Sequence, residues 1–477
     1  MTQAGARSDA IAAGGLLVVA LFLGGGNWLF PLQRMIVEIA AVLVLAWFCL
    51  RPGRMPQGNT TGISTKVIIG LIVATLLLLL VQLVPVSPSI WHSLPGREHQ
   101  LDVYTAAGAP DRWAPISLNS SATRDTIAFF LVPLSMFVAV LRIDRDAQRR
   151  LLMVIAAFCL LNGFLVMAQF QGFSWLTFYS TYGRPGTGLF ANKNHSAVFL
   201  VAAMPAVAWA IMESRQTVAI TTRRWIAVGT IGFLSLAVFG CLSRAGLGLL
   251  PLGIAVSAVI LAPGAVGGRR TAVAFGCFVA LMLLLVVILP KTDVVARALA
   301  RFDATSDLRY QFWPVVKDGI RAYFPVGSGF GTFQPVFAAL EPLSIVKPTY
   351  VNHAHSDYLE IALEGGLVAV ILMLAFIVWF AATAIVRLRT CRRGQVGFAP
   401  VAIAVAGITE LLLHSVLDYP LRTLALATLA SVYCAVLSNR PTALDLQELS
   451  RYRRGNRSRA RPEVDRNRPV ESLREFR

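Results

Sequence analysis

Charged residues are scarce in this chain of 477 residues: Asp, Glu, Lys and Arg together make up 14% of it. Hydrophobic residues make up 56%, and the mean hydropathy is +0.65. Soluble globular domains carry roughly 25% charged residues. The shortage of charge therefore excludes an ordinary soluble protein and predicts an integral membrane protein.

Cysteine and histidine are also rare, with six residues of each. The cysteines lie in or beside apolar runs or in a loop that we expect to be cytoplasmic, and none lies in the long external segments. The sequence therefore predicts neither a disulfide framework nor a cysteine metal site.

Long apolar runs, in contrast, are frequent. A run of about 17 to 23 apolar residues crosses roughly 30 Å of hydrocarbon. We count about twelve such runs, which begin near Ile11, Met35, Val67, Thr126, Leu151, Ala197, Trp225, Leu247, Thr271, Leu367, Ala399 and Leu421. The prediction is an all-α, polytopic integral membrane protein with about 12 transmembrane helices.

The distribution of Lys and Arg gives the expected orientation. Most of the basic residues lie in alternate loops, which the positive-inside rule assigns to the cytoplasm together with both termini. We expect residues 1–438 to form the membrane domain and residues 439–477 to form a basic, disordered cytoplasmic tail. The net charge of +18 is then explained by orientation signals and by contact of the tail with anionic membrane lipids, and no nucleic-acid partner is expected.

Three external segments are too long to be simple turns: residues 85–124, residues 171–194 and the largest, a periplasmic loop of residues 291–365 between spans 9 and 10. Loops longer than about 12 to 15 residues are usually functional. The first segment contains PVSPSIWHSLPGR, which is typical of an aromatic cap at the membrane interface, so we assign no catalytic role to His92.

Three arginines lie on this outer side: Arg184 in YGRPGTGLF, Arg244 in CLSRAG and Arg309 in DLRYQFW. Arginine forks bind phosphate groups bidentately, so a shared pocket would suit a phosphate-bearing lipid. The alternative role of an isolated arginine on the outer side is to anchor the chain, with its apolar stem along the membrane helix and its charged head in water. Arg244 is the exception, because a charge in a tight turn between two apolar runs is costly without a partner or a wet cavity.

Two histidines, His353 and His355, stand in VNHAHSDYLEIALEGG directly before an apolar run. A neutral imidazole can accept a proton from an attacking hydroxyl. A metal site is the weaker alternative, because histidines two residues apart reach one ion best from a strand and the following run predicts a helix. On a helix that begins near Ser356, three acidic residues share one face, where they pair with pocket arginines, face water or take part in catalysis; they are Asp357, Glu360 and Glu364.

These motifs together resemble the O-antigen ligase and O-antigen polymerase family of bacterial cell-envelope proteins, from about Tyr182 to Leu421. The resemblance rests on RPGTGLF followed by NKN, SRAG, DLRYQFW leading to FPVGSGFG, and HSDYLEIALEGG. The last motif is similar to the ligase pattern of His, then Asn, Ser or Gln, nine residues and Gly. Lys193 departs from the family, which often has proline there, and Ala369 stands where glycine is common.

The resemblance implies glycosyl transfer at the periplasmic face of the inner membrane from an undecaprenyl-pyrophosphate-linked glycan to a lipid-core or glycan acceptor. It implies a reaction without cofactor or metal ion, and attack of the activated hydroxyl on the anomeric carbon from the opposite side predicts inversion. Arg184, Arg244 and Arg309 would hold the pyrophosphate, and Asn194 would contact the substrate.

Among the histidines, His355 would be the general base, while His353 would assist in binding or position the loop. A ligase and a polymerase are not separated by these residues. A transporter or flippase for a lipid-linked glycan or a small anionic solute is the alternative, but it should concentrate its polar residues near mid-bilayer on broken helices.

Overall fold

The computed structural model describes residues 3–27, 29–51, 62–179, 186–214, 217–261, 309–348, 350–391 and 397–439. Nine helices among these residues are long and apolar enough to cross a membrane. They are α1 (Gln3–Leu23), α2 (Pro31–Leu50), α3 (Ile63–Val81), α6 (Ser120–Arg142), α7 (Arg145–Phe170), α8 (Lys193–Glu213), α9 (Ile220–Gly240), α10 (Arg244–Leu261) and α15 (Asp357–Thr390).

Two shorter apolar helices, α16 (Phe398–His414) and α17 (Leu424–Ser438), complete this set. Eleven of the predicted runs thus correspond to helices, and the run predicted near Thr271 lies outside the described residues. The polytopic helical architecture is confirmed, while the count of about 12 spans and the orientation stay predictions. The all-α prediction needs one small correction, because β1 (Pro85–Val86) and β2 (Ala114–Pro115) pair as two short antiparallel strands.

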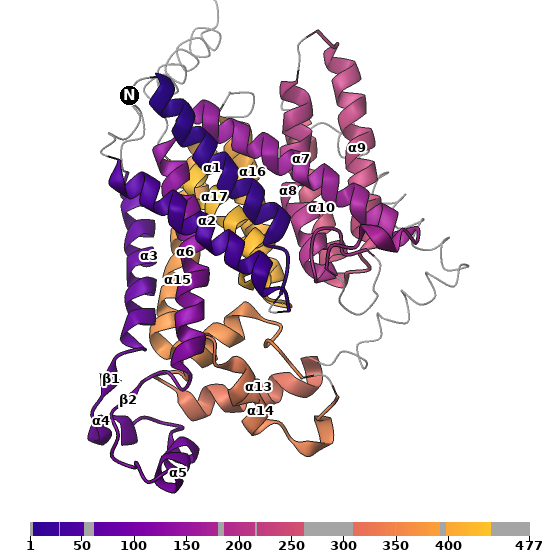
Figure 1. Ribbon diagram of the computed structural model, residues 1–477. Coiled ribbons are helices and arrows are strands. Elements are labelled where there is room, and N and C mark those ends of the chain that lie inside the picture. Colours follow the sequence, from indigo (N-terminus) through magenta and orange to yellow (C-terminus); the bar gives the residue numbers. More distant parts are fainter. Residues whose placement is uncertain are drawn as a thin grey trace, which may run out of the picture.

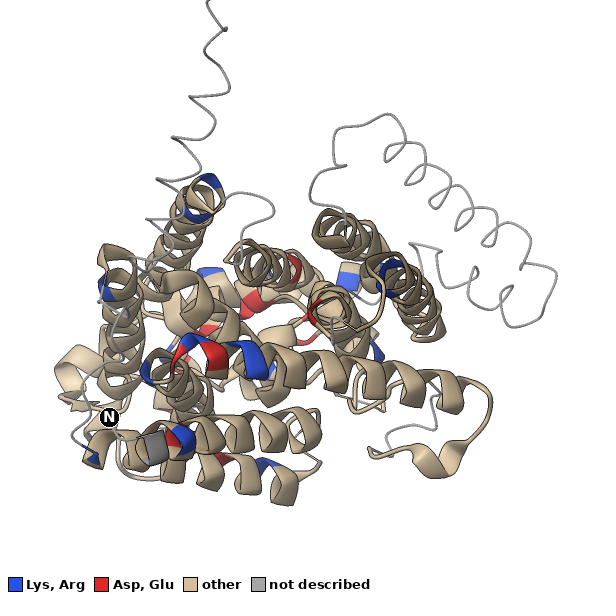
Figure 2. Ribbon diagram, turned by 90° about the horizontal axis from the view of Figure 1, so that it is seen from above, with Lys and Arg blue, Asp and Glu red and all other residues tan. Residues whose placement is uncertain are grey.

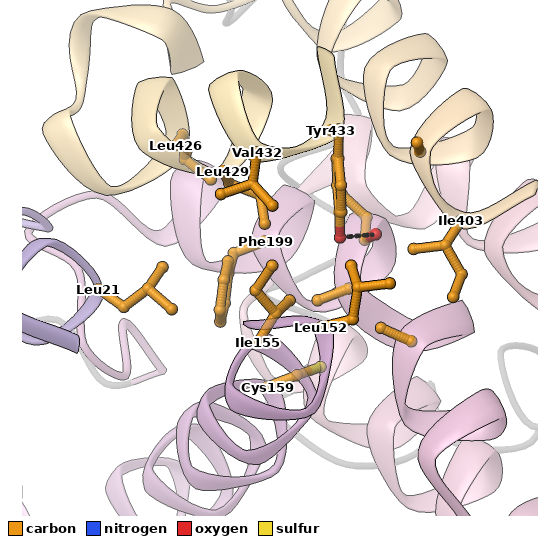
Figure 3. Packing of buried hydrophobic residues seen from close by; sticks show 14 of the residues in the cluster. Leu21, Leu152, Ile155, Cys159, Phe199, Ile403, Leu426, Leu429, Val432 and Tyr433 are labelled. Atoms are coloured by element: carbon orange, nitrogen blue, oxygen red, sulfur yellow. Dashed lines mark hydrogen bonds between the residues drawn. The ribbon is translucent and has the colours of Figure 1, made fainter. Parts of the chain in front are cut away.

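Helix α8 lies at the centre of the bundle and packs against α7, α9, α10 and α16. Its residues from His195 to Trp209 are buried without interruption, as expected of a helix that is apolar on all sides. Figure 3 shows how Phe199 of this helix packs with side chains of α1, α7 and α17. Tyr433 is fixed in the same core, because its hydroxyl donates to the backbone oxygen of Ala202 at 3.0 Å.

Helices from the first and the last of the segments predicted to be external form a layer, called the external layer below, at one end of the bundle, away from the end where the N-terminus lies (Figure 1). This layer contains α4 (Pro88–His92), α5 (Glu98–Ala106), α13 (Arg309–Tyr323) and α14 (Phe333–Leu340). Backbone bonding joins the first segment to the last, since Leu118 N donates to Ser328 O at 2.9 Å. A small apolar core of Phe312, Phe333 and Phe337 holds α13 and α14 together.

The glycines of FPVGSGFG make tight turns, as the sequence predicts: Gly327, Gly329 and Gly331 all have positive φ. Gln82 at the end of α3 clamps this turn region to α15. Its side-chain nitrogen donates to Glu364 O, and its side-chain oxygen accepts from Phe330 N, both at 3.0 Å.

Helix α15 begins at Asp357, directly after its N-cap Ser356, in agreement with the predicted start. It is broken at Gly366, whose φ of 60° and ψ of −152° are not helical. A side chain is excluded there, because an added Cβ would lie 2.1 Å from Pro325 O. The break separates a polar first segment from the apolar membrane span, which puts the acidic residues at the end of the bundle where the external layer lies.

Candidate functional site

The loop that precedes α15 folds back on the first turn of its own helix. His353 Nδ1 lies 2.8 Å from Glu360 Oε1, and Ala354 N donates to Glu360 Oε2 at 2.9 Å. Trp313 of α13 donates to Ala354 O at 2.9 Å from the other side. These contacts hold both histidines at the boundary between the helix bundle and the external layer.

A buried carboxylate, that of Asp418, lies next to His355. It lies in the turn after α16, it is fully buried, and its Oδ1 is 3.3 Å from His355 Nδ1. Asn194 donates to Oδ2 at 2.6 Å, and Tyr419 N donates to Oδ1 at 3.0 Å. Burial by itself would raise the pKa of Asp418, but His355, with help from His195, holds that pKa well below its usual range.

His355 therefore presents two different edges. Its Nδ1 is buried 3.3 Å from Asp418 Oδ1, in a contact without hydrogen-bond geometry, whereas 29% of its side-chain surface stays exposed. The backbone of His355 is left-handed, with φ 48°, a conformation that costs a non-glycine residue free energy and that clusters at functional sites.

Tyr419 packs among three imidazoles. Its ring centroid is 4.2 Å from that of His353 and 5.0 Å from those of His355 and His195. Burial and the charge of Asp418 raise the pKa of Tyr419, so its hydroxyl stays neutral. The ring thus acts as a rigid spacer that keeps the histidines apart.

Arg422, in the 3₁₀ helix η5 (Pro420–Arg422), neutralises the acidic face of α15. Its guanidinium lies 3.1 Å from Glu360 Oε1, 2.7 Å from Glu364 Oε2 and 4.0 Å from Asp357 Oδ1. Burial would lower the pKa of Arg422, but the three carboxylates outweigh that effect and raise it. Figure 2, which shows the protein from above, has acidic segments near the middle of the view as well as at its edge.

Of the three alternatives left open for these acidic residues, pairing with an arginine is the one found, but the partner, Arg422, is not one of the three arginines predicted for the pocket. Asp418 and Tyr419 were missed as well. All three lie in HSVLDYPLR, a polar stretch of nine residues between two apolar runs. Charges so close to two membrane spans were the available signal.

Of the predicted site residues, His353, His355 and Asn194 come together around Asp418 and Tyr419. Asn194 uses its amide on Asp418, so its contact with substrate stays a prediction. Arg309 is half-buried at the start of α13, within electrostatic range of His414. Arg244 is exposed at the start of α10, and Arg184 lies outside the described residues.

The turn that leads into Arg244 is held by a residue of α8. Leu242 has a positive φ of 51°, and its backbone oxygen accepts from Lys193 Nζ at 2.9 Å. The lysine that departs from the family pattern thus has a structural role in this chain. In the described part of the chain, no group of three or more His, Cys, Asp and Glu is arranged to hold a metal ion.

The comparisons with known proteins agree with the motifs. A family model described as O-Antigen ligase matches residues 229–374. The matched region contains Arg244, Arg309, both histidines of the loop and the acidic face of α15, and it stops short of Asp418 and Arg422. A comparison with curated proteins gave no match.

Proposed function

From the premise that residues 229–374 belong to the O-antigen ligase family, we propose that the protein transfers a glycan from undecaprenyl pyrophosphate to an acceptor hydroxyl at the periplasmic face of the inner membrane. Family and apolar helices together support a membrane glycosyltransferase-type function in O-antigen biosynthesis. The identity of the donor, the side of the membrane that the site faces and the roles of single residues are the proposed part.

The pairing of His355 with Asp418 carries the proposal. A carboxylate 3.3 Å from Nδ1 favours the tautomer in which Nδ1 carries the hydrogen, so Nε2 is left to accept a proton. The same carboxylate stabilises the imidazolium that forms when the proton arrives. A histidine held in this way is suited to general-base catalysis.

The proposed reaction is a single displacement. The acceptor oxygen attacks the anomeric carbon from the side opposite the pyrophosphate, and its proton passes to His355 Nε2. The new bond joins the acceptor oxygen to the anomeric carbon, while the bond from that carbon to the phosphate oxygen breaks. The electron pair leaves with undecaprenyl pyrophosphate, and the configuration at the anomeric carbon inverts.

Arg244 and Arg309 are suited to hold the leaving pyrophosphate for a reason beyond their charge. Each is the first residue of a helix, of 18 residues for α10 and 15 residues for α13. The N-terminus of a helix carries a partial positive charge and unpaired backbone N–H groups, which favour phosphate. We assign Arg184 to the same role, so fixed cations stabilise the leaving charge without a metal ion.

Arg422, unlike these three arginines, is not assigned to the pyrophosphate. Because its guanidinium is shared among Asp357, Glu360 and Glu364, it neutralises carboxylates that would otherwise repel an anionic donor. We assign it to the framework of the site and not to the donor.

The test is transfer from a radiolabelled polyprenyl-pyrophosphate oligosaccharide by the purified protein in EDTA, with and without a lipid-core acceptor. We expect full transfer by the wild-type protein and by the matched external variant His92→Ala. We expect no products from His355→Ala. A ladder without the acceptor identifies a polymerase, and one shifted product that requires the acceptor identifies a ligase. Full activity of His355→Ala would refute the general base, and transport without transfer would favour the flippase alternative.

A further inference from the structure

Two buried ionisable residues of α16 have no part in the reaction as described. Glu410 and His414 are one helical turn apart, and Asp418 follows by the same spacing just after the helix ends. Glu410 and Asp418 are 0% exposed and His414 is 1% exposed. An ionisable residue inside an apolar bundle is costly, which makes it a candidate for function.

Their polar atoms are unpartnered within the described residues. Neither carboxyl oxygen of Glu410 and neither ring nitrogen of His414 has a hydrogen-bond partner there. His414 Nε2 comes within 3.8 Å of Asp418 Oδ2, which is too long for a hydrogen bond in this conformation. Because each unpaired buried polar group costs free energy, these atoms are expected to pair when the site works.

The surroundings leave few other partners. Glu410 faces Gly253 of α10, where an added Cβ would lie 3.4 Å from Oε1, and Tyr433 of α17, whose hydroxyl is committed to Ala202. The ionisable groups that act on His414 are Asp418, Arg309 and His195. His195 is itself held by Thr423, at 2.7 Å from Nδ1.

We propose that Glu410 and His414 extend the pair of His355 and Asp418 into a chain of four alternating carboxyl and imidazole groups that sets the base for catalysis. The inference rests on the proposed function of His355. Both residues are positioning residues, because they act on the acceptor hydroxyl only through Asp418.

Each hydrogen bond of the proposed chain has a defined donor, and each needs a side-chain rotation, because His355 Nδ1 and His414 Nε2 lie 3.3 and 3.8 Å from Asp418 without hydrogen-bond geometry. A carboxyl group in an apolar interior takes its neutral form, so the Glu410 hydroxyl donates to His414 Nδ1. His414 Nε2–H then donates to Asp418 Oδ2, and His355 Nδ1–H donates to Asp418 Oδ1. The acceptor proton arrives at His355 Nε2 and leaves from there to external water, so no proton travels down the chain.

The chain explains how Asp418 stays a carboxylate in a buried position. With His414 as a donor, its negative charge is shared between two imidazoles, and His355 can release its proton readily after each turnover. Without that donor, Asp418 would bind the His355 imidazolium more tightly. The acidic limb of the rate profile, which reports protonation of the base, would then move to higher pH.

The test compares Glu410→Leu, Glu410→Gln and His414→Leu with the control Thr409→Val, whose hydroxyl bonds only to its own helix at Val405. The leucine variants should lose up to about 10-fold in rate at neutral pH, because the acidic limb should rise by about one pH unit. Glu410→Gln should retain activity, because an amide N–H replaces the acid hydroxyl. Equal losses in both Glu410 variants, or a loss without a change in the pH profile, would overturn the chain.

A second readout is independent of turnover. The ¹⁵N shifts of labelled histidines in nanodiscs report which ring nitrogen carries the hydrogen. We expect His414 as the Nε2–H tautomer in the wild-type protein and in Glu410→Gln, and a changed tautomer in Glu410→Leu. An unchanged tautomer would refute the chain even if wild-type transfer is normal, whereas a changed tautomer in a protein without transfer would refute only the proposed function.

Discussion

The substitution Asp418→Asn tests the centre of the site while keeping its shape. In the wild-type protein both carboxyl oxygens accept: Oδ2 from Asn194 at 2.6 Å, and Oδ1 from Tyr419 N at 3.0 Å, with His355 Nδ1 at 3.3 Å. An asparagine has one acceptor oxygen and one NH₂ group and carries no charge, so His355 loses the carboxylate beside Nδ1 whichever way the new amide faces.

The tautomer of His355 decides the size of the effect. If the new NH₂ group faces His355, Nδ1 must accept and Nε2 must carry the hydrogen, so the ring can no longer take a proton. Losing a general base together with its oriented carboxylate costs roughly 10²- to 10⁴-fold in rate. We therefore expect kcat of Asp418→Asn to fall by about three orders of magnitude, which corresponds to about 4 kcal/mol.

The assay is a double-mutant cycle on initial rates at saturating donor, with the exposed external variant Asp111→Asn as the matched control. If Asp418 acts through His355, then Asp418→Asn should add almost nothing to His355→Ala. Losses that multiply in the double variant would refute this reasoning, and so would an Asp418→Asn protein that retains wild-type kcat.

Three further outcomes follow from the same contacts. Arg422→Met should lower the free energy of unfolding by about 3–5 kcal/mol, because it leaves three buried carboxylates without their cation. Denaturation in detergent measures this change, and the control Arg149→Met should have little effect. Gly366→Ala should cost at least ~1–3 kcal/mol through its φ of 60° and the contact with Pro325, so an unchanged melting temperature would contradict the described break. Because Asp418 has a lowered folded-state pKa, its stabilisation is present above its unfolded pKa of about 3.9 and is lost as the pH falls. The melting temperature should therefore drop more between pH 6 and pH 3 in the wild type than in Asp418→Asn.

Much of the fold was predictable because a membrane span needs only length and apolar composition. The same holds for the start of α15, since Ser356 before three acidic residues is a strong helix-start signal. The glycine turns of residues 326–331 were predictable too, as glycine populates positive φ without penalty. Each of these features depends on a short stretch of sequence.

The site was predictable only in part, since it depends on contacts between distant stretches. His353 and His355 were identifiable because their loop is polar and stands before a span. Asp418 and Arg422 lie in a short turn, and nothing in the sequence indicates how close that turn comes to residues 353–364. Glu410 is a single polar residue in an apolar run, and its importance appears only with His414 and Asp418 beside it.

The order of charges around His355 indicates why the site can serve an anionic donor and a proton acceptor at once. Beside the imidazoles, Asp357, Glu360 and Glu364 share the guanidinium of Arg422. The Asp418 carboxylate, 3.3 Å from His355 Nδ1, favours the proton on His355 that the proposed reaction takes from an acceptor oxygen. The arginines that begin α10 and α13 suit the proposed pyrophosphate leaving group, since helix N-termini and guanidinium groups favour a phosphate. In the proposed reaction, the proton and the pyrophosphate are therefore received by different groups: the pair of His355 and Asp418 receives the proton, and the residues that begin α10 and α13 hold the phosphate.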